Sequence, residues 1–465
     1  MTKRLTTFSL MLMTVISVDS IRNMPIAASY GPMVVVYFIL FAILFLLPAA
    51  LASAELTSVF PDGGGIYTWV KEGLNKPLGL LAIWLQWAEN IVYYPQQLMF
   101  VFVIIFFGIN QMSGMNVDAS MVDQNTYLST LLLCGLVLFW VLSWINSRGL
   151  SMSVKLSDWM TYLGLIIPMV LLFIIFIYYI TKGHSGDLAV LLEPNQWSTW
   201  LSQDSISSLQ EKLDVVLLSY TGVEIATVHT RDVDNPKKSY PRALLLAAAI
   251  IMITQIIGCL AIYFSIPAGA ATGGNGLKYI ALTFYQYLTS IGLPWLTPVF
   301  CLLIACGLIG GLSNWILAPS RGLSIALKDQ DLLPILTRND EQTPNRILWL
   351  QTLVVSLLTV YLMSYASLEG AFGFLLNMMA LVYLSMYLLM FLALPKVCQG
   401  RKNTIIPFGK FGVLLVACLG CVVSSIPIVL SILTITSWHE VLARLVFGLF
   451  MFVLPVLLSM SRKRP

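Results

Sequence analysis

Four carboxylic acids lie inside strongly apolar stretches of this sequence, namely Asp19, Glu89, Asp158 and Glu224. An ionisable group at the centre of a membrane-spanning helix costs roughly 2.5–3.5 kcal/mol, so such groups usually face a polar cavity or a partner. Acids in a cavity can bind protons, metal cations or amines. A structural role is the other interpretation, and Asp19 with Arg22, three residues further on, is one candidate pair.

Two of the acids lie in polar interruptions of apolar runs, at residues 17–25 (SVDSIRNMP) and 219–224 (SYTGVE). Pro25 removes one backbone donor from the first run. The interruptions are about 200 residues apart, as in transporters built from two related repeats, where two broken helices meet at the midplane. Their exposed backbone groups would bind the charged ends of a small zwitterion. A pair of packing kinks is the alternative.

The composition places these interruptions in a membrane. Of the 465 residues, 58% are apolar and 10% are charged, and the mean hydropathy is +0.85. Soluble domains have about 25% charged residues. The excess apolar surface must therefore face lipid, and a span needs about 20 residues.

The apolar runs predict an all-α integral membrane fold of twelve transmembrane helices, and we treat residues 1–465 as a single transporter domain. The predicted helices are 8–29, 33–56, 77–107, 127–146, 156–181, 211–230, 241–265, 293–327, 346–364, 370–394, 411–434 and 440–461, with a short surface helix at 277–289. We expect one repeat at about 8–181, a second at about 211–394, and extra helices at about 411–461.

The positive charges orient these helices. If the N-terminus is cytoplasmic, 21 of the 26 Lys and Arg residues fall in cytoplasmic loops and ends. This asymmetry satisfies the positive-inside rule. We therefore expect a multi-pass protein of the plasma (inner) membrane with both termini in the cytoplasm.

Several motifs resemble a known family. Residues 217–224 (LLSYTGVE) and 234–243 (DNPKKSYPRA) are similar to the sixth helix and following loop of the amino acid–polyamine–organocation (APC) superfamily. Residues 54–55 (AE) and 63–70 (GGGIYTWV) resemble its second helix and glycine loop. Residues 315–322 (WILAPSRG) resemble the eighth helix of the glutamate/GABA antiporter branch.

The resemblance implies a LeuT-type fold with a five-plus-five inverted repeat, broken helices 1 and 6, and alternating access. Helices 1, 2, 6 and 7 would move against a scaffold of helices 3, 4, 8 and 9. The substrate-binding positions carried over are Ser17, Val18, Asp19, Ser20, Asn90, Tyr93, Ser219, Tyr220, Thr221, Gly222 and Trp315, to which we add the neighbouring acid Glu89.

Three of the carried-over residues have alternative or structural roles. Trp315 matches an aromatic residue that closes over substrate, and ordinary packing is the alternative. Glu55 would help to close the cytoplasmic gate or would fold the glycine loop. Glu224 would tie the broken sixth helix to its neighbours.

Asp19 departs from the family, whose members often have a G-S-G-like turn in helix 1. Its carboxylate would repel the carboxylate of an amino acid substrate in a dry site. Four roles stay open for it: pointing away, pairing with Arg22, binding a cation, or binding a substrate amine. Together with Glu89 it favours a neutral or cationic ligand over glutamate.

A second departure concerns ion coupling. Sodium-independent relatives often have a Lys on helix 5, and alignment on Pro168 puts Asp158 at that position. We hypothesise that Asp158 carries H⁺ or Na⁺, with Ser313 and Asn314 of helix 8 nearby. A capping acid at the cytoplasmic helix end is the alternative.

These observations predict a secondary active transporter of amino acids, working by cation-coupled uptake or exchange. An amine or polyamine exchanger of the same fold is the alternative. The sequence has no G-x-S-x-G or H-E-x-x-H motif, so we expect that the protein is not an enzyme. We also expect no metal or cofactor beyond a coupling H⁺ or Na⁺. The partners would be a small molecule and the lipid bilayer, without nucleic acid, in a monomer or homodimer.

Overall fold

The computed structural model describes residues 6–19, 21–60, 65–112, 125–148, 160, 162–183, 206–225, 236–265, 279–337, 344–363, 368–401, 404–434 and 448–460. Every regular element within these ranges is helical, which confirms the all-α prediction.

The elements of the first half follow the predicted order. They are α1 (Thr7–Val18), α2 (Met24–Ala28), η1 (Gly31–Met33), α3 (Val34–Phe41), η2 (Ala42–Leu46), α4 (Leu47–Val59), α5 (Gly65–Gly73), α6 (Lys76–Met112), α7 (Asn125–Ser147), η4 (Tyr162–Ile166) and α9 (Ile167–Thr181). The elements from η1 to α4 form one continuous span with a π-helical turn in its middle.

The second half contains α11 (Ile206–Leu218), α12 (Pro236–Ser265), α13 (Tyr279–Ser290), η9 (Pro294–Leu296), α14 (Thr297–Asp329), α15 (Pro334–Thr337), α16 (Asn345–Leu362), α17 (Leu368–Val397), α18 (Gly409–Leu433), η10 (Leu449–Val453) and α20 (Leu454–Met460). The predicted start at residue 241 is five residues late for α12, which begins at Pro236 and contains Pro241. Proline is well tolerated at the first helical position, where its missing N–H has no partner to lose.

Nine helices in the described part of the chain are long and apolar enough to cross a membrane. The two predicted long helices are confirmed, since α6 has 37 residues and α14 has 33. The count of twelve spans and the repeat boundaries stay predictions.

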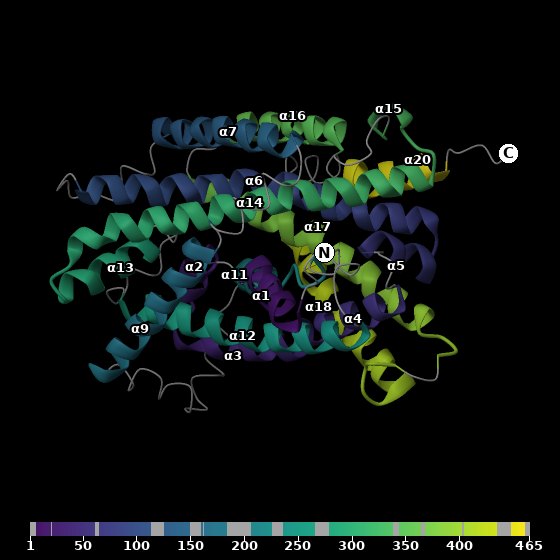
Figure 1. Ribbon diagram of the computed structural model, residues 1–465, viewed down its shortest axis with the longest axis horizontal. Coiled ribbons are helices and arrows are strands. Elements are labelled where there is room, and N and C mark those ends of the chain that lie inside the picture. The colour runs from purple at the N-terminus through teal and green to yellow at the C-terminus, as the bar shows by residue number, and fades with distance from the viewer. Residues whose placement is uncertain are drawn as a thin grey trace.

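The helices form two groups with the interrupted helices between them (Figure 1). In one group α6 packs along α14, and α7 packs with α16 on their outer side. In the other group α12 packs against α3 and α4 on the opposite side of the molecule. The helices α1, α2 and α11 lie between the groups; α1 and α2 contact α12, and α11 contacts α17 and α18. This arrangement matches the division into a helix 1–2–6–7 bundle and a helix 3–4–8–9 scaffold.

Burial separates central from lipid-facing helices. In the most apolar windows of α6 and α17, 78% and 72% of the residues are buried, against 28% in the span of η4 and α9. The span of η4 and α9 exposes large side chains such as Val170 and Phe173, as expected of a helix in contact with lipid. The interior of the molecule is thus built around α6 and α17, next to the interrupted helices.

Candidate functional site

The first helix is interrupted where the sequence predicts. Its first half, α1, ends at Val18, and Asp19 is extended with φ −70° and ψ 108°. The chain becomes helical again at Met24, with Pro25 in the first turn of α2. Proline fits this turn because its fixed φ suits a helix start. The break therefore separates two short helices, as predicted, while Ser20 lies outside the described residues.

The sixth helix is interrupted in the same way. Helix α11 ends at Leu218, and the chain continues through residues 219–225 without regular α-helix, in turns and irregular backbone. Gly222 has φ +103°, a conformation that side-chain-bearing residues rarely adopt, so glycine is needed at this point. Residues 226–235 lie outside the described part.

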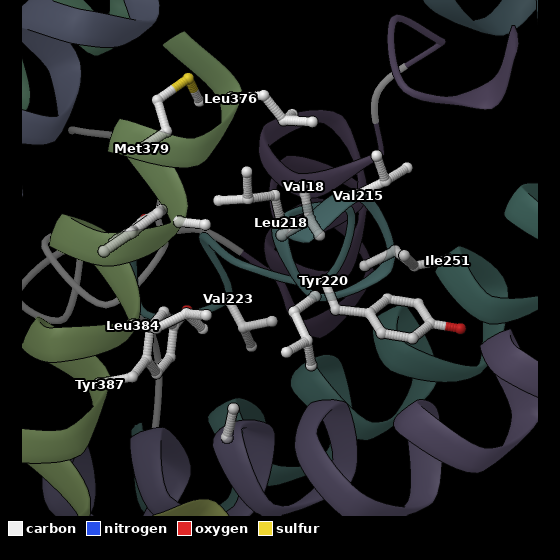
Figure 2. Close-up of a cluster of buried hydrophobic side chains, with 14 of the residues drawn as sticks. Val18, Val215, Leu218, Tyr220, Val223, Ile251, Leu376, Met379, Leu384 and Tyr387 are labelled. Carbon is white, nitrogen blue, oxygen red and sulfur yellow. The ribbon is translucent and has the colours of Figure 1, made fainter. Parts of the chain in front are cut away.

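The two breaks contact each other. The Asn23 side-chain amide donates a hydrogen bond of 3.2 Å to the Ser219 hydroxyl. A Cβ atom placed on Gly222 would lie 3.5 Å from the Trp315 ring and 3.6 Å from Val18. Figure 2 shows Val18, Leu218, Tyr220 and Val223 gathered at this meeting point. The two interruptions thus meet in the interior, beside the aromatic ring of Trp315.

A pocket of about 50 Å³ opens beside the helix 1 break. Holding one water takes roughly 10–15 Å³ on this measure, so the pocket has room for a few atoms. Four predicted residues line it together, namely Ser17, Asp19, Tyr93 and Trp315. The remaining lining residues are Ile16, Ile21, Gln97, Gly164, Leu165, Ile304, Gly307, Leu308 and Gly311. The pocket thus lies between α1 on one side and α6, η4 and α14 on the other.

Three predicted binding residues of the helix 6 break, Ser219, Tyr220 and Thr221, do not line this pocket. The hydroxyl of Ser219 donates to the Val215 carbonyl, and the hydroxyl of Thr221 donates to the Leu218 carbonyl. The Tyr220 hydroxyl donates to the Phe38 carbonyl at 2.8 Å. Ser219 and Thr221 therefore bond within their own segment, and Tyr220 joins the break to α3.

Asp19 is held by α12. One carboxylate oxygen accepts a hydrogen bond from Thr254 and the other from Gln255, each at 2.7 Å, and Asp19 is only 4% exposed. Neither Thr254 nor Gln255 was predicted from the sequence as a partner of Asp19. The signal was present, because Thr254 and Gln255 are the only polar pair in the apolar run 243–258.

Arg22 points towards α6. Its guanidinium donates to the side-chain oxygens of Gln97 and Asn23, both at 3.3 Å, and lies 4.8 Å from the centre of the Tyr93 ring. Arg22 also lies close enough to Glu89 for electrostatic attraction. Its positive charge therefore opposes the negative charge of Glu89, which weakens the charge argument against an acidic ligand.

Glu224 fixes the helix 6 break to two other helices. Its carboxylate accepts hydrogen bonds from Gln86 of α6 at 3.0 Å, from Tyr383 of α17 at 2.8 Å, and from Tyr387 of α17. The backbone N–H of Gly222 donates to the Tyr387 hydroxyl at 2.9 Å. Two helices outside the interrupted pair therefore hold this segment in place.

Glu89 and Asn90 form a smaller contact on α6. The Asn90 amide donates to the Glu89 carboxylate at 3.1 Å and to the Gln86 carbonyl at 2.8 Å. Both residues are at most 2% exposed.

Glu55 lies at the end of α4, away from the pocket. Its carboxylate accepts backbone hydrogen bonds from Ile405 at 2.6 Å and Ile406 at 3.1 Å. It thereby fixes the segment that leads into α18.

Of the predicted glycine loop, Gly65 is the first residue of α5, and residues 61–64 lie outside the described ranges.

Helix α5 is fixed to the end of α14. The Tyr67 hydroxyl and the Lys71 ammonium donate to Asp329 at 2.6 Å and 2.9 Å. Burial and the bond to Asp329 raise the pKa of Tyr67 well above its usual range, so its hydroxyl is a donor at neutral pH.

Helix 5 approaches α14 without intervening side chains. A Cβ on Gly307 would lie within about 2.5 Å of the Gly164 backbone, and a Cβ on Gly164 would collide with the α14 backbone. Both glycines line the pocket. The main chains of the two helices therefore touch at this point of the wall, which also includes Leu165, Ile304 and Leu308.

The predicted ion-coupling residues lie beyond what the structure describes. Asp158 falls outside the described ranges, and Ser313 and Asn314 lie on α14 with side chains that are not described. Among the described residues, no group of three His, Cys, Asp or Glu side chains is arranged to hold a metal ion.

Two broken helices that meet beside a polar pocket, within a bundle of apolar helices, define a membrane transporter of LeuT-type architecture. The solved structure of MhsT in complex with L-phenylalanine shares this fold. It aligns with a TM-score of 0.64 at 14% identity and covers 90% of this chain and 97% of that one.

The chain belongs to the amino acid permease family of the APC superfamily, whose model matches residues 5–454. An uncharacterized transporter of Legionella pneumophila is 32% identical over 90% of this chain and 87% of its own length. The glutamate/gamma-aminobutyrate antiporter of Lactococcus lactis is 26% identical over 86% of this chain and 77% of its own length. The predicted family is thus confirmed.

Proposed function

We propose that the protein is a secondary active transporter that moves amino acids across the membrane by alternating access. The observation that carries this proposal is the contact between the two breaks, through Asn23 and Ser219, next to the pocket under Trp315. Broken helices offer backbone donors and acceptors at the ends of helical dipoles, and these suit the charged ends of a zwitterion.

The small pocket fits this mechanism. A space of about 50 Å³ holds a few atoms, so a whole amino acid needs the helices to move apart. A substrate that binds one arrangement better than another shifts the population of arrangements, which is the basis of alternating access.

Counterflow in proteoliposomes tests the proposal. Vesicles loaded with an unlabelled amino acid should accumulate the same labelled compound transiently, and uptake should saturate. A panel of acidic, neutral and basic amino acids identifies the substrate class. Absence of counterflow for every amino acid and amine in the panel would contradict the proposal.

The alternative function is exchange of amines or polyamines; Asp19 in the pocket wall favours it, although its carboxylate would have to exchange the Thr254 and Gln255 bonds for a substrate ammonium. A carboxylate can bind an ammonium group directly. Counterflow of putrescine or agmatine that exceeds that of every amino acid would select this alternative.

Cation coupling through Asp158 is part of the proposal. An acid at this position would carry H⁺ or Na⁺ where relatives have a Lys. We expect Asp158→Asn to lose dependence on the ion gradient, and full dependence in this variant would contradict the role.

We also propose that the protein lies in the plasma (inner) membrane with both termini cytoplasmic. The support is the uneven distribution of the 26 Lys and Arg residues over the loops. Reporter fusions at each terminus, one active only in the cytoplasm and one only outside it, check the orientation. Size-exclusion with light scattering distinguishes a monomer from a homodimer.

A further inference from the structure

A second buried polar cluster lies on α11, one to two turns before the helix 6 break and away from the pocket. Its centre is Asp214, which is 2% exposed. Gln210 of α11, Asn377 of α17, Ser431 of α18 and Thr434, which follows α18, surround it. None of these residues lines the pocket.

The hydrogen bonds of this cluster leave one acid oxygen without a donor. The Asn377 amide donates to Asp214 Oδ2 at 3.1 Å, and the Ser431 hydroxyl donates to Asn377 Oδ1 at 3.3 Å. The Thr434 hydroxyl donates to Gln210 Oε1 at 2.8 Å. Asp214 Oδ1 is buried and has no hydrogen-bond partner within the described ranges.

The charges around Asp214 do not offset an ionised carboxylate. Within the described part of the chain Asp214 forms no ion pair. The titratable groups that interact with it are Glu211 on its own helix and Tyr30, which follows α2 and has a buried hydroxyl. The Lys212 ammonium lies over the Tyr30 ring, 5.9 Å from its centre.

An ionised carboxylate in such a place is costly, because burial removes its water and the neutral amides of Asn377 and Gln210 replace only part of it. A proton on Oδ1 removes the charge and leaves the Asn377 bond to Oδ2 intact. The site therefore has the chemistry of a proton-binding carboxyl group in the membrane interior.

We propose that Asp214 binds a proton that couples transport to a pH gradient, in addition to the cation proposed at Asp158, an inference that rests on the proposed transport function. Asp214 joins α11 of the interrupted pair to α17. The protonated acid stabilises this contact in a dry interior. Loss of the proton to water restores the charge and favours separation of α11 from α17, so proton binding and helix position are linked.

The test compares wild type, Asp214→Asn and Glu211→Gln in proteoliposomes. Asparagine keeps the shape of the acid and cannot exchange a proton. We expect Asp214→Asn to keep counterflow within about threefold of wild type and to lose stimulation by an inward proton gradient. Glu211→Gln, which removes an exposed acid from the same helix, should keep that stimulation.

Three outcomes overturn the proposal: full stimulation of Asp214→Asn by the proton gradient, a wild type that does not respond to this gradient, or a response to a sodium gradient that Asp214→Asn removes. Failure of the transport proposal itself can be told apart from these outcomes, because wild type would then show no counterflow at all.

Infrared difference spectroscopy provides a readout that does not depend on transport. A pH titration of wild type should show the C=O band of a protonated, buried carboxyl group, and Asp214→Asn should lack this band. Glu211→Gln should retain it. A wild-type spectrum without the band, or an unchanged spectrum in Asp214→Asn, contradicts the assignment.

Discussion

The breaks in helices 1 and 6 are fixed in different ways. Asp19, at the helix 1 break, is bonded to α12, which is helix 7 and belongs with helix 1 to the helix 1–2–6–7 bundle. Glu224, at the helix 6 break, is bonded to α6 and α17, which lie outside this bundle. If the bundle moves as one body, as the proposed alternating access requires, the first contact persists, whereas the second joins parts that would shift. The Glu224 contacts are therefore the ones to disrupt first.

The largest effect is expected for Glu224→Ala. The change leaves the Gln86 amide and the Tyr383 and Tyr387 hydroxyls without their acceptor. A buried group without its partner costs about 1–3 kcal/mol. We expect a clear drop in the melting temperature in detergent and at least a tenfold loss of counterflow. Glu72→Ala, on the exposed side of α5, is the control and should change neither.

Gly222→Ala should have the next largest effect. The φ of +103° is strained for alanine and costs of order 1–3 kcal/mol, while the added Cβ would find ordinary contact distances to Trp315 and Val18. We expect a several-fold loss of the maximal counterflow rate. Gly373→Ala, on α17 in open space, is the matched control. Equal rates for the two variants would show that the turn at Gly222 is unimportant.

Asp19→Asn sharpens the comparison from the other side. Because both oxygens of Asp19 face α12, we expect a loss of roughly 1–2 kcal/mol in stability and a KM for amino acids within about threefold of wild type. Thr254→Val removes one donor to the same carboxylate and should act similarly. A tenfold or larger rise in KM for Asp19→Asn alone would instead make Asp19 a substrate ligand.

The smallest effect is expected for Lys71→Ala, far from both breaks. Its ammonium pairs with Asp329 in a partly exposed position. Such pairs contribute about 0–1 kcal/mol and are screened by salt. Thermal unfolding at low and high salt should show a small difference that shrinks with salt. A loss of stability above about 2 kcal/mol would assign this contact a larger part in fixing α5.

Local sequence signals predicted the elements well. The lengths of the apolar runs predicted α6 and α14. The polar residues around Pro25 and Gly222 indicated both breaks. These features depend on neighbouring residues. One boundary failed because α12 begins at Pro236 and continues through Pro241, which lies inside the helix.

The side-chain contacts of the site were beyond such signals. Asp19 and Thr254 are 235 residues apart, and Tyr387 is 163 residues from Glu224. A helix that is apolar on most sides gives no period to show which face meets which neighbour. Thr254 and Gln255 stand out in the sequence as a polar pair, but only the three-dimensional packing identified Asp19 as their partner.

The contact of Gly164 with Gly307 has a consequence for the movement of helix 5. Where two main chains touch directly, the contact itself includes no side chain whose rotamer would have to change on separation. If the helices move apart as proposed, separation at this contact would change little side-chain freedom, and we therefore expect the cavity to widen here. A methyl group at either glycine would clash with the facing backbone and would keep the two main chains from making this contact.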